Sequence, residues 1–272
     1  MPDPATLLPL IGLLMVIGAI AGVLAGLLGV GGGIVLVPAF YYTFAALGYD
    51  GPQLMQICLG TSLATIIVTS LRSLAAHNRR GAVEWDILRR WGPGIALGAV
   101  LGVLVATRLR SDVLVALFGV LAVLIGLYMI LGRNSWQLGD RMPGGPVRWI
   151  LSPLIGFLSV LMGIGGGSFG VPTMTLFGVP IHRAVATASG YGVIIAVPSA
   201  IGFLFANVDL APPLTVGAVN LGAFAIVICM TLVTAPWGAA LAHRMNPKPL
   251  KRVFGVFLIL VALNMLRRVA LG

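Results

Sequence analysis

Two glycine clusters are the part of this chain whose residue types and spacing could build a binding site. They are Gly-Val-Gly-Gly-Gly at 29–33 and Gly-Ile-Gly-Gly-Gly at 163–167, and a proline follows each at the same spacing, Pro38 and Pro172. A glycine inside a helix costs about 1 kcal/mol relative to alanine, so these clusters with their prolines predict two helix breaks. Glycine also lets backbone N–H groups approach a ligand with no Cβ in the way.

Hydroxyl side chains accompany both clusters. Ser168 follows the second cluster directly, and Thr61 with Ser62, and Thr187 with Ser189, lie further along the chain after each cluster. These hydroxyls could donate hydrogen bonds to an oxyanion, although a Ser or Thr in a membrane helix commonly bonds a carbonyl of its own preceding turn. The predicted substrate-binding residues are Gly31, Gly32, Gly33, Thr61, Ser62, Gly165, Gly166, Gly167, Ser168, Thr187 and Ser189.

The composition places these residues in a membrane. Of the 272 residues, 59% are hydrophobic and only 9% are charged, and the mean hydropathy is +1.07. Apolar runs of roughly 20 residues, the length of a helix that crosses the bilayer, recur along the chain. The net charge of +10 could suggest nucleic-acid binding, but the Lys and Arg residues are scattered through short loops, where they determine topology. We therefore expect contact with the lipid bilayer and none with nucleic acid.

The expected helices recur in the same order in two halves of one membrane domain, 1–135 and 136–272. Each half has a helix that leads into its glycine cluster, a short apolar piece after the cluster, and three full helices. The clusters and their prolines are 134 residues apart, which indicates an internal duplication. The expected segments are 7–28, 34–47, 53–76, 91–107 and 112–131, then 147–162, 169–177, 182–206, 214–242 and 251–268. The sequence thus predicts an all-α polytopic membrane protein with about 8–10 membrane segments.

The number of crossings predicts the relative orientation of the two halves. Each half has three full helices besides its glycine-broken pair, so its total is odd whether that pair crosses twice or returns as a hairpin. The halves should therefore insert in opposite orientations, as an inverted repeat. Thirteen of the 17 Lys and Arg residues fall on one face of this topology, which the positive-inside rule makes cytoplasmic. Both termini are then extracytoplasmic.

Inverted halves would bring the two glycine loops together near the membrane midplane. Non-helical backbone at that depth is tolerated only where it is buried in protein or lines a cavity. The helices that begin after the loops, at Ile34 and Ser168, would direct free N–H groups and positive dipole ends into the shared space, which favours an anion. The alternative is that a glycine merely lets two helices pack closely. We prefer this alternative for four other glycines: Gly22, Gly26, Gly98 and Gly102.

The charged residues fit an anionic substrate. All seven acidic residues fall in predicted loops or at helix ends, which argues against a carboxylate proton relay or a cation site. Arg72 and Arg183, near helix ends, could snorkel to the interface or form an anion funnel, and the amides Gln56 and Asn220 could serve the site or the fold. Because the spans hold no His, Asp or Glu cluster, we expect no enzyme, no metal site and no cofactor.

At these motifs the chain resembles the sulfite exporter TauE/SafE family, also called the 4-toluenesulfonate uptake permeases. The likeness rests on GLLGVGGGIVLVP and GFLSVLMGIGGGSFGVP, on QICLGTSLAT and HRAVATASGYG, and on the hydropathy of nearly the whole chain. The second copy departs from the first, because Ala186-Thr187-Ala188 stands where Gly60-Thr61-Ser62 does. The resemblance implies a bacterial inner-membrane permease for sulfite, sulfonates or other organosulfur anions.

The function expected from residues and resemblance together is secondary transport or export of small oxyanions by alternating access. Pro38 and Pro172 would mark the helix breaks or gates of this transporter. An anion-selective channel, whose half-helices also meet at the midplane, is the alternative. The outward movement of a monovalent anion gains about 2.3 kcal/mol per 100 mV of membrane potential, so export could proceed without ATP. A homodimer is compatible with the sequence.

Overall fold

The apolar segments of the chain form helices throughout, as predicted. The computed structural model describes residues 4–28, 32–132, 136–242 and 247–271, and these residues form ten helices and one two-stranded hairpin. The elements are α1 Pro4–Leu28, α2 Gly33–Ala46, α3 Leu54–Asn78, α4 Trp85–Ala106, α5 Ser111–Leu131, α6 Gly145–Leu161, α7 Gly167–Leu176, α8 Ile181–Leu204, β1 Thr215–Val216, β2 Val219–Asn220, α9 Leu221–Ala242 and α10 Pro247–Leu271. The predicted all-α class is confirmed.

Helix length separates full membrane spans from shorter pieces. Five helices are long and apolar enough to cross a bilayer, namely α3, α4, α5, α8 and the Leu221–Gly238 part of α9. By contrast, α2 has 14 residues and α7 has 10. At about 1.5 Å per residue neither reaches the roughly 30 Å of the hydrocarbon core. The short pieces predicted after the two glycine clusters are therefore present, and each begins inside a cluster.

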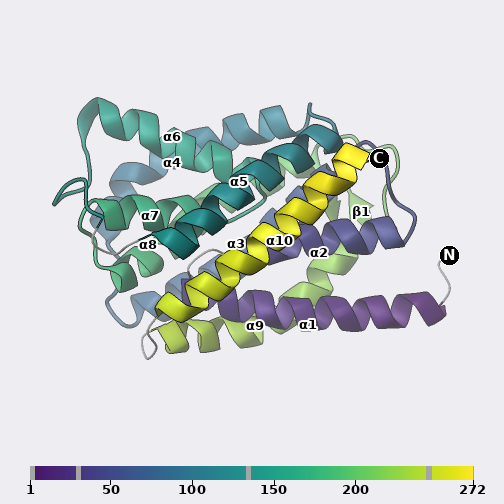
Figure 1. Cartoon of the computed structure of the whole chain (residues 1–272), viewed down its shortest axis with the longest axis horizontal. Coiled ribbons are helices and arrows are strands. Elements are labelled where there is room, and N and C mark those ends of the chain that lie inside the picture. Colours follow the sequence, from purple (N-terminus) through teal and green to yellow (C-terminus); the bar gives the residue numbers. More distant parts are fainter. Residues whose placement is uncertain (1–3, 29–31, 133–135, 243–246, 272) are drawn as a thin grey trace.

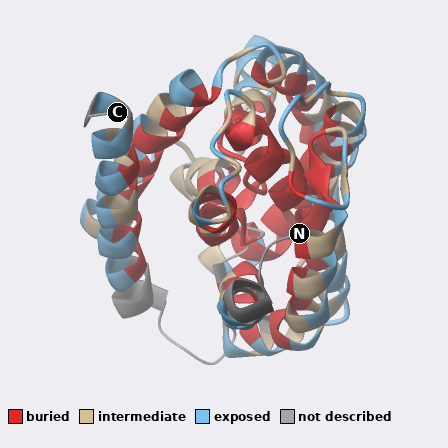
Figure 2. Ribbon diagram, turned by 90° about the vertical axis from the view of Figure 1, so that its right-hand side faces the viewer, coloured by how far each residue is buried: buried red, intermediate tan, exposed pale blue. Residues whose placement is uncertain are grey.

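The helices α3 and α8 form the centre of the molecule. Most residues of both helices are buried, and Figure 2 shows buried residues concentrated in the middle of the bundle. The two helices touch at Gly192 of α8, where a Cβ would collide with the Ser70 hydroxyl of α3 and lie 3.8 Å from Cγ2 of Ile66. Most of the buried polar side chains described also belong to these two helices. Any polar site in this bundle must therefore be built around them.

Three further helix pairs surround the centre: α1 with α9, α4 with α6, and α5 with α10 (Figure 1). Glycines make the first two pairs possible. A Cβ on Gly22 of α1 would lie 2.9 Å from Cα of Thr231 in α9, and a Cβ on Gly98 of α4 would collide with the Pro153 carbonyl oxygen of α6. A Cβ on Gly102 would also be too close to α6. The close-packing interpretation of these three glycines is confirmed.

The helix α4 begins at Trp85, six residues before the predicted start at 91. Asp86 lies in its first turn, where a negative charge stabilises a helix N-terminus. Asp86 also pairs with Arg90 one turn later at 3.0 Å. Arg89 and Arg90 are therefore on the helix and not in the preceding loop.

The helix α9 begins at Leu221, not at 214, because a short hairpin precedes it. Gly217 turns this hairpin with a φ of 58°, a left-handed conformation that favours glycine. Asn220 then caps the helix, since its Oδ1 accepts the N–H of Ala223 at 2.8 Å. The Asn220 amide also donates to the Pro213 carbonyl oxygen at 2.9 Å. Asn220 was predicted to serve either the site or the fold, and these hydrogen bonds show that it serves the fold.

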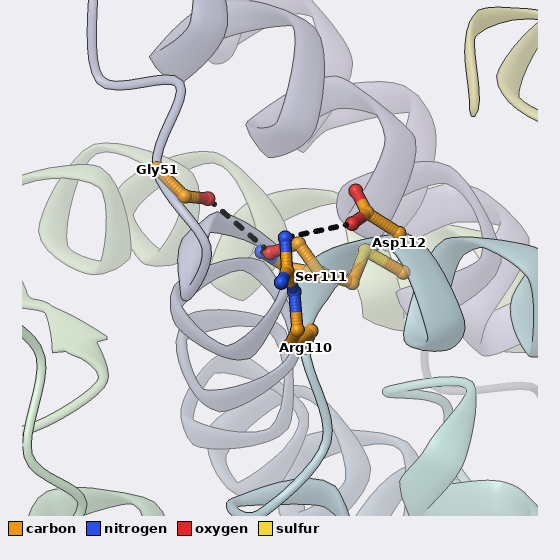
Figure 3. Close-up of polar contacts among 5 residues, drawn as sticks. Gly51, Arg110, Ser111 and Asp112 are labelled. Atoms are coloured by element: carbon orange, nitrogen blue, oxygen red, sulfur yellow. Dashed lines mark hydrogen bonds and ion pairs between the residues drawn. The ribbon is translucent and has the colours of Figure 1, made fainter. Parts of the chain in front are cut away.

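Ser111 fastens the start of α5 to the segment that precedes α3 (Figure 3). Its backbone N–H donates to the Pro52 carbonyl oxygen at 2.8 Å, and its hydroxyl lies 3.5 Å from the Gly51 carbonyl oxygen. The buried Gln56 amide donates to three carbonyl oxygens, one at the end of α4 and two in the turn that leads to α5. Gln56 is therefore also structural, and it holds one end of α3 in place.

Candidate functional site

The two glycine clusters meet at Gly33, the first residue of α2. A Cβ on Gly33 would collide with the Gly163 carbonyl oxygen and would lie 2.9 Å from both Ile164 Cα and Ile66 Cδ1. Only a glycine fits here without moving the second cluster. The N-terminus of α2 therefore lies directly against the second glycine loop, next to the middle of α3.

The backbone of both clusters uses conformations that favour glycine. Gly32 has a φ of 78° and Gly163 a φ of 60°, so an L side chain at either position would be strained. The Gly32 carbonyl oxygen accepts the N–H groups of Val35 and Leu36, which forms the first turn of α2. Gly31, one of the predicted site residues, lies outside the described residues.

The second cluster leads into α7 against a tyrosine that sequence reasoning did not select. A Cβ on Gly166 would collide with Cβ of Tyr191, and a Cβ on Gly170 would lie 2.7 Å from Cδ2 of the same ring. Tyr191 is fully buried in α8. Its position four residues after Thr187, on the same face of the helix, is the signal that could have indicated it.

The hydroxyls of α3 bind backbone groups of the opposite half of the chain. Ser62 donates to the Gly163 carbonyl oxygen at 2.7 Å, and Thr61 Oγ1 accepts the backbone N–H of Asn220 at 2.9 Å. Both side chains are fully buried. Ser62 therefore joins the second glycine loop, whereas Thr61 holds the residue that precedes α9.

The hydroxyls of α8 behave differently from each other. Thr187 Oγ1 accepts the backbone N–H of Glu84 at 2.9 Å, and Glu84 is the residue that precedes α4. Ser189 donates to the Ala186 carbonyl oxygen of its own helix at 2.5 Å. Thr61 and Thr187 thus have matching partners, and in each case the partner precedes the fourth helix of the other half.

Three buried hydroxyls beside the second cluster have no hydrogen-bond partner among the described residues: Ser159, Ser168 and Tyr191. Ser168 is 6% exposed and the other two are fully buried. A buried polar group without a partner is rare in folded proteins, since it loses its hydrogen bonds to water. Ser168, a predicted site residue, therefore retains an available hydroxyl.

The two prolines lie inside the short helices and not at the breaks. Pro38 is the sixth residue of α2 and Pro172 the sixth of α7, and both helices continue beyond them. The interruptions lie at the glycine clusters, because each short helix begins at the last glycine of its cluster. A gating role for either proline stays a prediction.

The two predicted funnel arginines have different surroundings. Arg183, in the first turn of α8, forms an ion pair with Glu84, and their side chains are 50% and 29% exposed. This pair lies beside the bond between Thr187 and the Glu84 N–H, so two interactions join α8 to the start of α4. Arg72 is exposed on α3.

The acidic residues keep away from the glycine clusters, as predicted. The six that the structure describes lie in loops or at the start of helices: Asp50, Glu84, Asp86, Asp112, Asp140 and Asp209. Asp3 lies outside the described residues. Hydroxyls and backbone groups, and not ionised side chains, are what the described portion of the chain places around the two clusters.

A sequence model of the family described as "Sulfite exporter TauE/SafE" matches residues 14–265. The chain belongs to the TauE/SafE family. The match includes both glycine clusters, α3 and α8, so the resemblance read from these motifs is confirmed.

Similar proteins have names that agree with membership of the TauE/SafE family. The chain is 32% identical over 255 residues to a Haemophilus influenzae protein named "Probable membrane transporter protein", covering 93% of this chain and 97% of that one. A Methanocaldococcus jannaschii protein with the same descriptive name is 27% identical over 258 residues, covering 94% and 96%. A third, from Bacillus subtilis, is 28% identical over 278 residues, covering 93% and 96%. This TauE/SafE protein is therefore similar, over nearly its whole length, to proteins named as probable membrane transporters.

Proposed function

We propose that this protein is a secondary transporter that moves small sulfur-containing oxyanions across the bacterial inner membrane by alternating access. The observation that carries the proposal is the contact of Gly33 with Gly163 and Ile164. It joins the start of a short helix to the loop that leads into the other one. In transporters built from repeats, short half-helices that meet at mid-depth bind the substrate with their N-terminal N–H groups.

The packing of the helices supports an inverted repeat. The first helix of each proposed half pairs with the fourth helix of the other, α1 with α9 and α6 with α4. Glycines in these pairs recur at or near the spacing of the repeat, because Gly22 and Gly156 are 134 residues apart and Gly102 and Gly238 are 136 apart. Each of the four lies against the backbone or a side chain of the paired helix. Equivalent residues therefore perform equivalent packing in both halves.

In this mechanism the two threonine contacts are joints, that is, contacts that break and re-form as the protein changes conformation. Thr61 binds Asn220 and Thr187 binds Glu84, so each central helix holds the segment before the fourth helix of the opposite half. In the orientation given by the positive-inside rule, the Glu84 contact is cytoplasmic and the Asn220 contact is extracytoplasmic. Both termini are also extracytoplasmic in this orientation. Alternating access would open either joint while the other stays closed.

The proposal is tested by anion flux into proteoliposomes that contain the purified chain. Sulfite, thiosulfate, sulfoacetate and sulfate form the panel, and we expect saturable flux of at least one of them, accelerated by the same anion on the opposite side. Absence of flux for the whole panel in folded protein would refute the proposal.

A matched pair of glycine variants locates the flux at the clusters. Gly166→Val should abolish flux, because its side chain would collide with Tyr191, whereas Gly12→Val should retain it, because nothing described lies within 4 Å of a Cβ there. Gly32→Val, which adds strain at a φ of 78°, should behave as Gly166→Val does. Flux that persists in folded Gly32→Val and Gly166→Val would exclude a site at the clusters.

An anion-selective channel is the second candidate, because short helices with N-termini at mid-depth also occur in pores. Flux that does not saturate, together with unitary currents in a planar bilayer, would favour the channel over the transporter.

A further inference from the structure

We infer that the anion site is asymmetric: it lies at the second glycine loop, where Ser159, Ser168 and Tyr191 supply its hydroxyl donors. This inference rests on the proposed function and names the residues that recognise the substrate. Two of them, Ser159 and Tyr191, have no role in the sequence prediction. None of the three has a hydrogen-bond partner among the described residues, although all are at least nine-tenths buried.

All three residues border the loop that leads into α7. Ser159 lies two residues before the end of α6, and its carbonyl oxygen accepts the N–H of Ile164 at 2.9 Å. Ser168 is the second residue of α7, and because helical side chains lean toward the N-terminus, its hydroxyl extends toward the free N–H groups of the first turn. Tyr191 packs with its Cβ against Gly166 at the start of the same helix and with its ring against Gly170, one turn further along.

The first half has no equivalent set of hydroxyls. At the 134-residue spacing of the clusters, Ala25 and Ile34 correspond to Ser159 and Ser168. At the 126-residue spacing of Thr61 and Thr187, Thr65 corresponds to Tyr191. Ala25 and Ile34 carry no hydroxyl, and Thr65 already donates to the Thr61 carbonyl oxygen at 2.8 Å.

The N-terminus of α2, moreover, has a backbone carbonyl oxygen of the second glycine loop beside it. The Gly163 carbonyl oxygen lies against Gly33 and accepts the Ser62 hydroxyl, so its negative partial charge disfavours an anion at the start of α2. The residue that corresponds to Ser62 is Ala188, which has no hydroxyl to hold the first loop in return. A carbonyl oxygen therefore lies beside the start of α2, whereas hydroxyl groups without a hydrogen-bond partner among the described residues lie near the start of α7.

The chemistry of the donors indicates the class of ligand. Neutral hydroxyls and backbone N–H groups bind most tightly an ion that has several acceptor oxygens at fixed angles, because each donor needs its own lone pair. A small oxyanion such as sulfite, with several oxygens on one sulfur atom, meets this requirement. Chloride offers no directed oxygens and should bind weakly at the same site.

The test measures the dissociation constant of sulfite by titration calorimetry on the purified full-length chain, with sulfate, thiosulfate and chloride for comparison. Three variants remove the hydroxyls: Ser159→Ala, Ser168→Ala and Tyr191→Phe. Each should weaken sulfite binding by about tenfold to a hundredfold, the loss expected for a hydrogen bond to a charged group.

Three matched controls remove hydroxyls that already have partners in their own helices, namely Ser152→Ala in α6, Thr173→Val in α7 and Thr65→Val in α3. These variants should leave the constant unchanged. Should Ser168→Ala not fold, Ser168→Thr should keep sulfite affinity and Ser168→Val should lose it.

The outcomes separate the inference from the proposed function. Sulfite affinity that is unchanged in the three folded variants, or that falls equally in the controls, overturns the asymmetric site while wild-type binding still supports an oxyanion transporter. If the wild-type chain binds none of the oxyanions, the proposed function and the inference both fail.

Discussion

At the scale of single residues, Gly33 and Ser62 decide how closely the two halves approach. Gly33 has no side chain to hold the second loop away, and Ser62 donates a hydrogen bond to the carbonyl oxygen that comes near. The two residues are on α2 and α3, and both act on Gly163. Changing either one therefore alters the contact between the clusters directly.

Replacing Gly33 with alanine should destabilise the protein by about 1–3 kcal/mol, the usual cost of overpacking a core, and should reduce anion flux. The added Cβ would collide with the Gly163 carbonyl oxygen. Gly12→Ala is the control, because its Cβ meets open space and alanine favours a helix by up to about 1 kcal/mol. Thermal unfolding and proteoliposome flux measure both effects. A Gly33→Ala protein as stable and active as wild type would contradict this packing.

Thr187→Val removes the hydroxyl oxygen that accepts the backbone N–H of Glu84. The Glu84 N–H would lose its partner, at a cost of about 1–3 kcal/mol, whereas Thr187→Ser should keep the bond. Hydrogen exchange measured by mass spectrometry should be faster in the peptide containing Glu84 in the valine variant alone. Equal exchange in the two variants would mean that this hydrogen bond does not hold the start of α4.

At the scale of elements, the attachment of α4 and of α9, the fourth helices of the two halves, depends on the contacts at their first residues. The start of α9 has a hairpin, an Asn cap and the Thr61 contact, whereas the start of α4 has the Thr187 contact and the ion pair of Glu84 with Arg183. Since that ion pair is partly exposed, it contributes at most about 1 kcal/mol. Hydrogen bonds to backbone N–H groups are therefore the main attachment at both places.

Asn220→Ala should shorten or loosen α9 at its start and lower the stability by about 0.5–2 kcal/mol, as expected for a lost N-cap. Asn220→Ser should lose less, because its hydroxyl oxygen can still accept the Ala223 N–H although it lacks the amide that donates to Pro213. The midpoints of thermal unfolding of the two variants provide the comparison. An alanine variant at least as stable as the serine variant would show that the cap is dispensable.

At the scale of the whole molecule, the start of α1 and the end of α10 lie at the same end of the bundle (Figure 1). This arrangement agrees with the proposed topology, in which both termini are extracytoplasmic. In that topology the connection between α5 and α6 would lie on the cytoplasmic side.

Fusions to a periplasm-dependent phosphatase test the topology. A fusion after residue 272 should be active, whereas a fusion after residue 140, in the loop between α5 and α6, should be inactive. A cytoplasmically fluorescent reporter at the same two positions should give the opposite pattern, because the two reporters require opposite compartments. Phosphatase activity only at residue 140 would reverse the orientation derived from the positive-inside rule.

The sequence predicted the short helices correctly because their cause is local. Glycines repeated in apolar sequence weaken a helix wherever they occur, so the starts of α2 and α7 could be read from the chain within two residues. The start of α9 could not, because its apolar sequence continues from the preceding turn without a change in periodicity. The hairpin before α9 depends on the cap and on Thr61, a residue far away in the chain.

What the sequence by itself determined is the class of protein: a polytopic helical membrane protein with two glycine-broken helices and with its acidic residues confined to loops and helix ends. These properties follow from residue types and their order, which local physics converts into helices and breaks. Only the tertiary structure decided which hydroxyls are paired. Ser62 donates to a carbonyl oxygen 101 residues away, whereas Ser168, also buried beside a glycine cluster, has no partner among the described residues. Hydrogen bonds form between groups that packing brings together, and no local pattern specifies that distance.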